Sequence, residues 1–150
     1  MENMKILVIN GPNLNMLYTR DKKQYGNKTL DEINAMLYNT AHTSGAKHTI
    51  ELVFFQSNHE GALIDFIQEH HEADGMIINP GALTHYSYAL ADALRDFPGA
   101  KVEVHLSNIN EREDFRRVSV VRDVCDAVYM GEKEQSYGKA FDWLVSNSHL

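Results

Sequence analysis

The sequence contains few cysteines, few prolines and no long apolar run. With one cysteine, Cys125, and three prolines among 150 residues, the chain cannot form an internal disulfide, and this usage predicts a reducing cytosol. The apolar neighbours Val124 and Val128 favour a buried thiol. No apolar stretch approaches the ~18 residues that a membrane-spanning helix needs, and no targeting segment precedes the first strand-like run. We therefore expect a soluble, cytoplasmic protein.

Basic residues are also scarce, because 14 Lys and Arg stand against 21 Asp and Glu, for a net charge of -7. Nucleic-acid binding needs a clustered basic face, and here the basic residues are scattered. The sequence has no phosphate-binding glycine-lysine motif and no glycine-rich dinucleotide fingerprint. It has eight histidines but no His-Glu-x-x-His, and His59-Glu60 and His70-His71-Glu72 lack the spacing of a metal cage. We expect no nucleic acid, cofactor or metal.

What the chain does have is a regular alternation between short apolar runs and amphipathic stretches. The apolar runs span residues 5–9, 52–55, 76–78 and 127–130, and residues 102–106 alternate apolar with polar side chains. This alternation is typical of βα units with parallel strands. A length of 150 residues with 43% hydrophobic residues suits one compact core. The sequence predicts a single α/β domain over residues 1–150.

The helices are predicted from their caps and their apolar stripes. Thr29 and Glu32 have capping-box spacing, Gly45 is a natural stop, and Ser57 with Glu60 forms a second capping box. Helical spacing predicts a third helix and a final one. Their inward stripes are Tyr86, Leu90, Ala93, Leu94 and Phe97, and Tyr137, Ala140, Phe141, Leu144 and Val145.

Four of the apolar runs break off into polar residues that are useful in catalysis. These endings are Asn10-Gly11-Pro12-Asn13, Gln56-Ser57-Asn58-His59, Asn79-Pro80-Gly81 and Ser107-Asn108. In an open parallel sheet, ligands bind outside the carboxyl ends of the strands, so these residues should converge. The sequence predicts one composite active site.

The connection after the first strand is unusually long. Roughly twenty residues with little periodicity separate it from Thr29, and they include Arg20 and Tyr25. A βα loop usually has about 2 to 6 residues, and longer ones are often functional. We interpret residues 14–28 as a lid over the strand ends.

Five blocks of the chain together resemble the type II 3-dehydroquinate dehydratases. The blocks occur in order, at family spacing and over nearly the whole chain: Asn10-Gly11-Pro12-Asn13-Leu14-Asn15, Thr19-Arg20 with Tyr25-Gly26, Gln56-Ser57-Asn58-His59-Glu60-Gly61, Asn79-Pro80-Gly81-Ala82-Leu83-Thr84-His85 and Glu103-Val104-His105-Leu106-Ser107-Asn108. The resemblance implies a flavodoxin-like, five-stranded parallel sheet of order 2-1-3-4-5 with helices on both faces. It also implies a dodecamer built from trimers. The implied reaction is anti elimination of water from 3-dehydroquinate through an enolate to 3-dehydroshikimate, without a cofactor, in shikimate synthesis or quinate breakdown.

Elimination next to a ketone requires a base, an oxyanion stabiliser and an acid. The resemblance implies that Tyr25 is the base. A free phenol has a pKa of about 10, so it needs a nearby positive charge to ionise at neutral pH. We expect the permanently charged Arg20 to stabilise the phenolate. The resemblance makes His105 the acid, and Glu103 shares its face of an alternating strand and is expected to orient the imidazole. Asn13 is implied to position a water against the enolate oxygen.

The resemblance also implies a set of substrate ligands. Asn79, His85 and Arg116 would bind substrate hydroxyls. The Ser107 hydroxyl and the backbone N–H groups of Leu106 and Ser107 would hold the substrate carboxylate. Asp92 would reach the site of a neighbouring subunit. Arg112 and Arg117 are open to two interpretations, as site residues or as solvated surface charges.

Taken one at a time, most of these residues have an ordinary structural interpretation. The set comprises a lid tyrosine, a strand histidine, turn asparagines and a histidine at a helix start, namely Tyr25, His105, Asn13, Asn79 and His85. A non-catalytic, flavodoxin-like module that binds a small anion is therefore the alternative function. The chain departs from the usual family pattern at Tyr18, Lys22-Lys23, Ala91, Asn110 and residues 118–123, which concern the lid and the subunit contacts.

Overall fold

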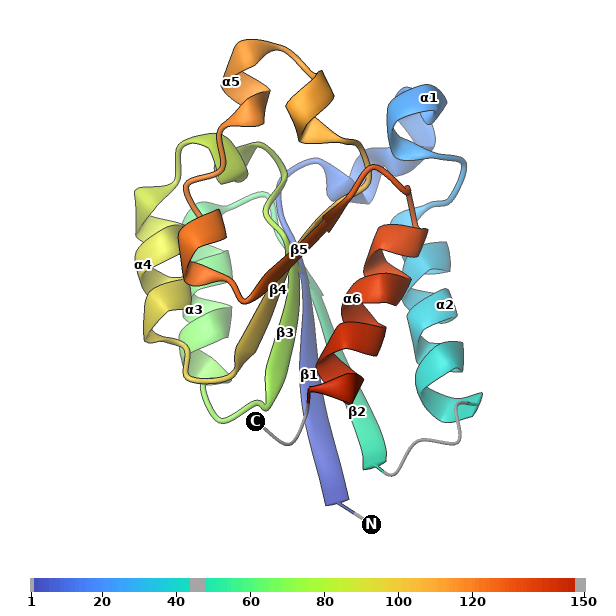
Figure 1. The fold of residues 1–150 in the computed structure, drawn as a ribbon, viewed down its shortest axis with the longest axis vertical. Coiled ribbons are helices and arrows are strands. Elements are labelled where there is room, and N and C mark those ends of the chain that lie inside the picture. Colours follow the sequence, from blue (N-terminus) through green and yellow to red (C-terminus); the bar gives the residue numbers. More distant parts are fainter. Residues whose placement is uncertain (1, 44–47, 148–150) are drawn as a thin grey trace.

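The structure is a computed structural model that describes residues 2–43 and 48–147. Within this part of the chain, five strands form one parallel sheet of order β2-β1-β3-β4-β5 (Figure 1). The strands are β1 (Glu2–Asn10), β2 (His48–Gln56), β3 (Gly75–Asn79), β4 (Ala100–His105) and β5 (Ala127–Met130). All four pairings are parallel. The predicted flavodoxin-like sheet and its strand order are confirmed.

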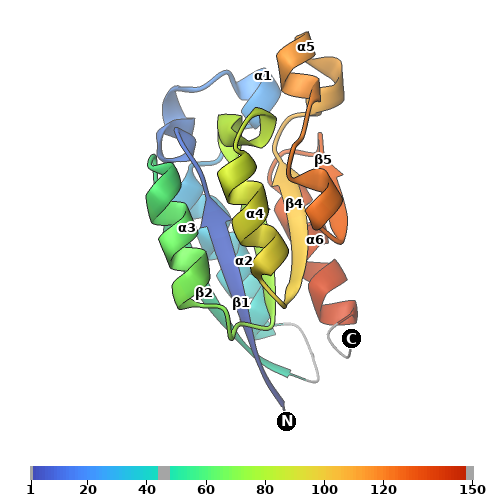
Figure 2. The ribbon, with the colours of Figure 1, turned by 90° about the vertical axis from the view of Figure 1, so that its left-hand side faces the viewer.

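Helices cover both faces of this sheet. The four long ones are α2 (Leu30–Thr43), α3 (Glu60–Glu69), α4 (Tyr88–Asp96) and α6 (Gln135–Ser146). Helices α3 and α4 lie on one face, and α2 and α6 on the other (Figures 1 and 2). None of these described helices combines the length and apolar character that a bilayer crossing requires.

Shorter helices lie in the connections. In the part of the chain that the structure describes, they include the α-helical turns α1 (Lys22–Tyr25) and α5 (Asp114–Arg117). They also include the 3-10 turns η1 (Leu14–Thr19), η2 (Gly81–His85), η3 (Ile109–Glu111) and η4 (Arg122–Val124). The segment predicted as a lid, residues 14–28, thus contains η1 and α1.

Each face of the sheet has its own apolar layer. Along β1, Met4, Ile6 and Val8 pack with α2 and α6, whereas Leu7 and Ile9 pack with α3 and α4. All five side chains are buried. A central strand buried on both faces cannot alternate polar with apolar residues, which is why β1 appears in the sequence as a continuous apolar run.

The first predicted capping box is confirmed. The Glu32 backbone N–H donates to Thr29 Oγ1 at 3.2 Å, and the Thr29 backbone N–H donates to Glu32 Oε1 at 3.0 Å. Hydrogen bonds that the Glu32 carboxylate accepts from Thr29, first of all from its backbone N–H, lower the pKa of Glu32 below its ordinary value. The expected helix stop, Gly45, lies outside the described residues.

The second predicted capping box is wrong. Ser57 Oγ accepts a hydrogen bond from the backbone N–H of His59 at 3.0 Å, and His59 is the residue that precedes α3. The hydroxyl is thus used in a tight turn two residues ahead and does not cap the helix. The Glu60 carboxylate accepts instead from the hydroxyl of Ser87, so it links α3 to the start of α4.

Two predicted burial assignments need correction. Tyr86 was expected on the inward stripe of the third helix, but α4 begins at Tyr88 and Tyr86 is exposed. Its side chain precedes the helix and so does not share the phase of Leu90 and Leu94. Cys125 is partly rather than fully buried; even so, burial and the charge of Glu103 raise the pKa of its thiol to about 12. Val145 is partly buried and packs against the core, as predicted.

The loops after β1 and β3 touch backbone to backbone at Gly11. A Cβ atom at this position would lie 2.3 Å from the carbonyl oxygen of Pro80. We predict that Gly11→Ala lowers the free energy of unfolding by about 1–3 kcal/mol, because rigid backbone must move to admit the methyl group. Chemical denaturation measures this change.

Gly61 is the matched control. It lies in the first turn of α3, and a Cβ atom there would have no neighbour within 4 Å. We expect Gly61→Ala to leave stability unchanged or to raise it by up to about 1 kcal/mol, because alanine loses less backbone entropy in a helix. Equal stabilities for the two variants would contradict the proposed clash.

Candidate active site

The carboxyl ends of β1, β3 and β4 open into a polar cleft of about 110 Å³. Helices α1 and α5 lie above this edge of the sheet (Figure 1). Nine of the predicted site residues line the cleft, namely Asn13, Arg20, Tyr25, Asn79, His85, His105, Leu106, Ser107 and Arg116. They come from the ends of β1, β3 and β4 and from the connections that follow these strands, so the fold brings together residues as far apart in the chain as Asn13 and Arg116.

Tyr25 contacts two guanidinium groups. The Arg20 Cζ atom is 4.0 Å from the centroid of the tyrosine ring, which places this arginine against the ring face. The hydrogen bond to the phenolic oxygen comes from Arg112, whose Nη1 donates to Tyr25 Oη at 3.1 Å and to Ser107 Oγ at 3.1 Å. Arg112, which the sequence left open, is thus a site residue with only 15% of its side chain exposed.

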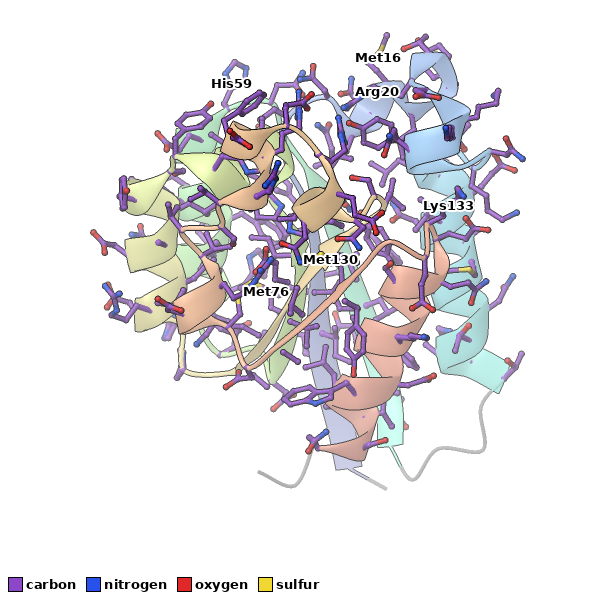
Figure 3. The ribbon with its side chains drawn as sticks, turned by 45° about the horizontal axis from the view of Figure 1, so that its top comes forward. Met16, Arg20, His59, Met76, Met130 and Lys133 are labelled. Carbon is purple, nitrogen blue, oxygen red and sulfur yellow. The ribbon has the colours of Figure 1, made fainter. Side chains whose placement is uncertain are left out.

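The single turn of α1 determines where Tyr25 lies. The Asp21 side chain accepts from the Lys23 backbone N–H at 3.0 Å and starts the turn. Gly26, with φ at 86°, ends it in a conformation that disfavours a side chain. Figure 3 shows Arg20 just before this turn, above the strand ends. A cap on each side thus fixes the one turn that carries the tyrosine.

His105 and Glu103 form a buried pair on β4. The imidazole Nε2 lies 2.5 Å from Glu103 Oε2, and the Glu103 side chain is 0% exposed. Burial alone would raise the pKa of Glu103, but the hydrogen bonds and positive charges of His105 and Arg122 outweigh burial and lower it. Because Nε2 donates to the carboxylate, Nδ1 is left for another partner.

His85 is held as a hydrogen-bond acceptor. Its Nδ1 donates to the carbonyl oxygen of Val118 at 2.7 Å, which leaves Nε2 with a free lone pair. Burial lowers the pKa of His85, and the nearby positive charges of His105, Arg116 and Arg112 lower it further. A neutral imidazole in this state can accept a hydrogen bond from a hydroxyl group.

Asn79 is fixed by a buried tyrosine that the sequence analysis placed only in the core. Asn79 Nδ2 donates to Tyr137 Oη at 3.0 Å, and the Tyr137 hydroxyl donates to Asn10 Oδ1 at 2.5 Å. Asn79 Oδ1 accepts from the Gly81 backbone N–H at 3.1 Å. Burial raises the pKa of Tyr137 above its ordinary value, so its hydroxyl keeps its proton and joins two strand ends.

Asn13 occupies a left-handed conformation, with φ at 70°. Its backbone N–H donates to Asn58 Oδ1 at 3.0 Å. Gln56 Nε2 donates to the same Asn58 oxygen at 3.1 Å and to the Gly11 carbonyl at 3.1 Å. The polar residues at the carboxyl end of β2 therefore support the loop after β1, a role that sequence reasoning missed.

The comparisons with known proteins agree with this geometry. The sequence profile of the family described as Dehydroquinase class II matches residues 4–145. The chain belongs to this family. A 3-dehydroquinate dehydratase from Roseiflexus castenholzii is 53% identical over 143 residues, which is 95% of this chain and 88% of that protein.

Solved structures of class II dehydroquinases are also similar. The type II dehydroquinase from Butyrivibrio crossotus gives a TM-score of 0.89 at 48% identity, covering 95% of this chain and 97% of that one. The type II dehydroquinase from Propionibacterium acnes gives a TM-score of 0.89 at 33% identity, covering 97% and 99%. Fold and sequence thus agree on the class II dehydroquinase family.

Two residues predicted for this class II dehydroquinase site do not line the cleft. Glu103 lies behind His105 and contacts it. Asp92 is on α4 with 74% of its side chain exposed, and it pairs with Arg95 at 3.1 Å. Its predicted place in a neighbouring subunit stays a prediction. Among the described residues, no group of three His, Cys, Asp or Glu side chains is placed to hold a metal ion.

The buried Glu103 should make the dehydroquinase less stable in acid. Because its folded pKa lies below the ordinary value of 4.5, its charge stabilises the fold fully above that pH, and this contribution is lost as pH falls through the folded pKa. We predict that the stability advantage of the wild type over Glu103→Gln shrinks below about pH 4.5. Urea unfolding of both proteins at several pH values measures this difference in the free energy of unfolding. A difference that does not change with pH would contradict the predicted contribution of the Glu103 charge.

Proposed function

We propose that this chain is a type II 3-dehydroquinate dehydratase, which removes water from 3-dehydroquinate by anti elimination through an enolate. The observation that carries this proposal is the tyrosine in contact with two arginines in a cleft that also contains a carboxylate-paired histidine, in a chain of the class II dehydroquinase family. The reaction belongs to shikimate synthesis and to quinate breakdown.

Tyr25 acts as the base. Its phenolate takes a proton from the carbon next to the substrate ketone, and the C–H electron pair moves into the enolate. Both guanidiniums favour the anionic oxygen, Arg112 through a hydrogen bond at 3.1 Å and Arg20 through its charge near the ring. Because arginine side chains stay protonated in proteins, neither guanidinium competes with Tyr25 for the transferred proton.

Asn13 stabilises the enolate oxygen by positioning a water molecule. The left-handed backbone of Asn13, fixed by Asn58, directs this residue to the cleft wall. A donor that is already oriented needs no reorganisation when negative charge develops, and such donors lower the barrier. We therefore assign oxyanion stabilisation to Asn13.

His105 acts as the acid. As the enolate re-forms the ketone, its electron pair expels the hydroxyl, and the imidazolium protonates this leaving group so that it departs as water. The Glu103 carboxylate orients the ring through its hydrogen bond with Nε2. Transfer of the proton from Tyr25 to solvent, and of a new proton to His105, restores the resting state.

The substrate is an anion, and its proposed ligands suit that charge. Ser107 supplies its hydroxyl, and the backbone N–H groups of Leu106 and Ser107 supply donors for the carboxylate. Asn79 and His85 bind ring hydroxyls, with Arg116 as a further hydroxyl ligand. All five residues line the cleft.

The lid and the assembly complete the proposal. Residues 14–28 would close over the bound substrate, anchored by Leu14 and Leu17, which are both buried. In a dodecamer built from trimers, Asp92 would reach a neighbouring site, which suits its exposure on α4. A cytosolic location is proposed from the single cysteine alone.

Loss of the Tyr25 hydroxyl should abolish most turnover. We predict that Tyr25→Phe lowers kcat by at least about 100-fold, because no other group takes over the proton abstraction. The measurement is the ultraviolet absorbance of the conjugated product. Tyr18→Phe is the matched control, since Tyr18 lies in the same segment with 61% of the residue exposed.

In that assay, near-normal turnover by Tyr25→Phe would contradict the role of the base. A wild-type protein that binds 3-dehydroquinate without forming product would instead support the alternative function, a module that binds small anions.

The absence of a Schiff base distinguishes this reaction from that of the type I dehydratases, which act through a lysine. Among the described residues that line the cleft, none is a lysine. We predict that borohydride added together with 3-dehydroquinate leaves no covalent adduct on the protein by mass spectrometry. A trapped lysine adduct would reject the mechanism.

A further inference from the structure

The carboxylate of Glu103 has two partners besides His105. Arg122 donates from Nε to Oε1 at 3.3 Å and from Nη2 to Oε2 at 3.3 Å, and Ser119 Oγ donates to Oε2 at 2.9 Å. The guanidinium therefore spans both carboxylate oxygens. Arg122 lies on η4 and Ser119 in the preceding loop, so both reach the carboxylate from outside β4.

The reaction creates a charge problem at this carboxylate. When His105 is protonated, the imidazolium balances the negative charge of Glu103. When His105 has given its proton away, a fully buried carboxylate faces a neutral ring, and an uncompensated buried charge is unfavourable. Some other cation must then remain beside Glu103.

Arg122 is placed to be this cation. Its side chain is 33% exposed, so the guanidinium is partly hydrated while it contacts the buried carboxylate. Arginine side chains in proteins keep their positive charge, so this cation is present whichever protonation state His105 has. It also lies within residues 118–123, the stretch in which this chain departs from the usual family pattern.

Other titratable groups face the Glu103–His105 pair from several elements. Burial and the charge of Glu103 raise the pKa of the Cys125 thiol, which follows η4. Burial and the charge of His105 lower the pKa of His85 on η2. The charges of Arg112 and Arg116 also lower the pKa of His85. The remaining charged or titratable groups that line the cleft are Arg20 and Tyr25. Arg122 is the cation that bonds directly to the carboxylate.

We propose that Arg122, together with Ser119, is a positioning residue that keeps Glu103 ionised and oriented while His105 alternates between its two protonation states. This inference rests on the proposed function, in which His105 is the acid. Arg122 touches neither the substrate nor the reacting atoms in this account and acts only through Glu103.

Removal of the Arg122 charge should shift the pH dependence of turnover. With less positive charge beside Glu103, the imidazolium keeps its proton to higher pH, so the high-pH limb of the kcat profile should move upward. For Arg122→Gln we expect a shift of about 1 pH unit, the lower end of what a neighbouring charge produces. We expect kcat to fall about 10-fold, a part of what a positioned acid contributes.

Three further variants separate charge from geometry. Arg122→Lys keeps the charge but loses the bidentate contact with Glu103. Its high-pH limb should therefore stay near the wild-type position, and its kcat should fall less than that of Arg122→Gln. Arg122→Met is a second charge-free side chain in case the amide variant folds poorly. Lys139→Gln removes a surface cation that pairs with Glu132 at 2.6 Å, and it should leave the whole profile unchanged.

The measurement is kcat against pH by the ultraviolet assay, on material whose fold and assembly are checked by thermal unfolding and size exclusion. A high-pH limb that stays in place in both charge-free variants would overturn the inference, even if kcat falls. A limb that moves equally in Arg122→Lys would also overturn it. An inert wild type would instead reject the proposed function, so the two failures are distinguishable.

Discussion

The site depends on hydrogen bonds that join the ends of three adjacent strands. The Gly11 backbone N–H donates to the Asn79 carbonyl at 2.8 Å, and the Ser57 backbone N–H donates to the Asn10 carbonyl at 3.1 Å. The Tyr137 hydroxyl then bridges the Asn10 and Asn79 side chains from α6. These bonds continue the pattern of the sheet beyond its last residues, so the polar loops start from a rigid edge.

The charge at this edge is the opposite of the charge of the whole protein. The chain carries a net charge of -7, yet three arginines line the cleft, and none of the described lining residues is Asp or Glu. Positive charge concentrated in a cleft attracts an anion and lowers the cost of holding a phenolate. Glu103 supplies a negative charge without entering the cleft, because His105 lies between them.

The sequence predicted the fold well because the strands and helices follow from local patterns, namely apolar runs and helix caps. The apolar runs led to five strands, and the capping box of Thr29 and Glu32 located the start of α2. Nine predicted site residues line one cleft, because parallel strands end at the same edge. The capping box of Ser57 and Glu60 failed, because a serine hydroxyl can satisfy a turn as easily as a helix end.

The supporting residues were left open or missed for a different physical reason. Arg112 bonds Tyr25 across 87 positions, Tyr137 bonds Asn10 across 127, and Arg122 bonds Glu103 across 19. No periodicity or spacing connects such pairs, and each residue alone has an ordinary explanation as a surface charge or a core aromatic.

A buried polar or charged group still requires a partner. Once His105 and Glu103 are placed on a buried strand, the pair therefore demands a compensating cation, although the sequence does not say which one. The residues that perform the chemistry can be predicted from motifs, whereas the residues that keep those groups in the right charge state follow only from the packed structure.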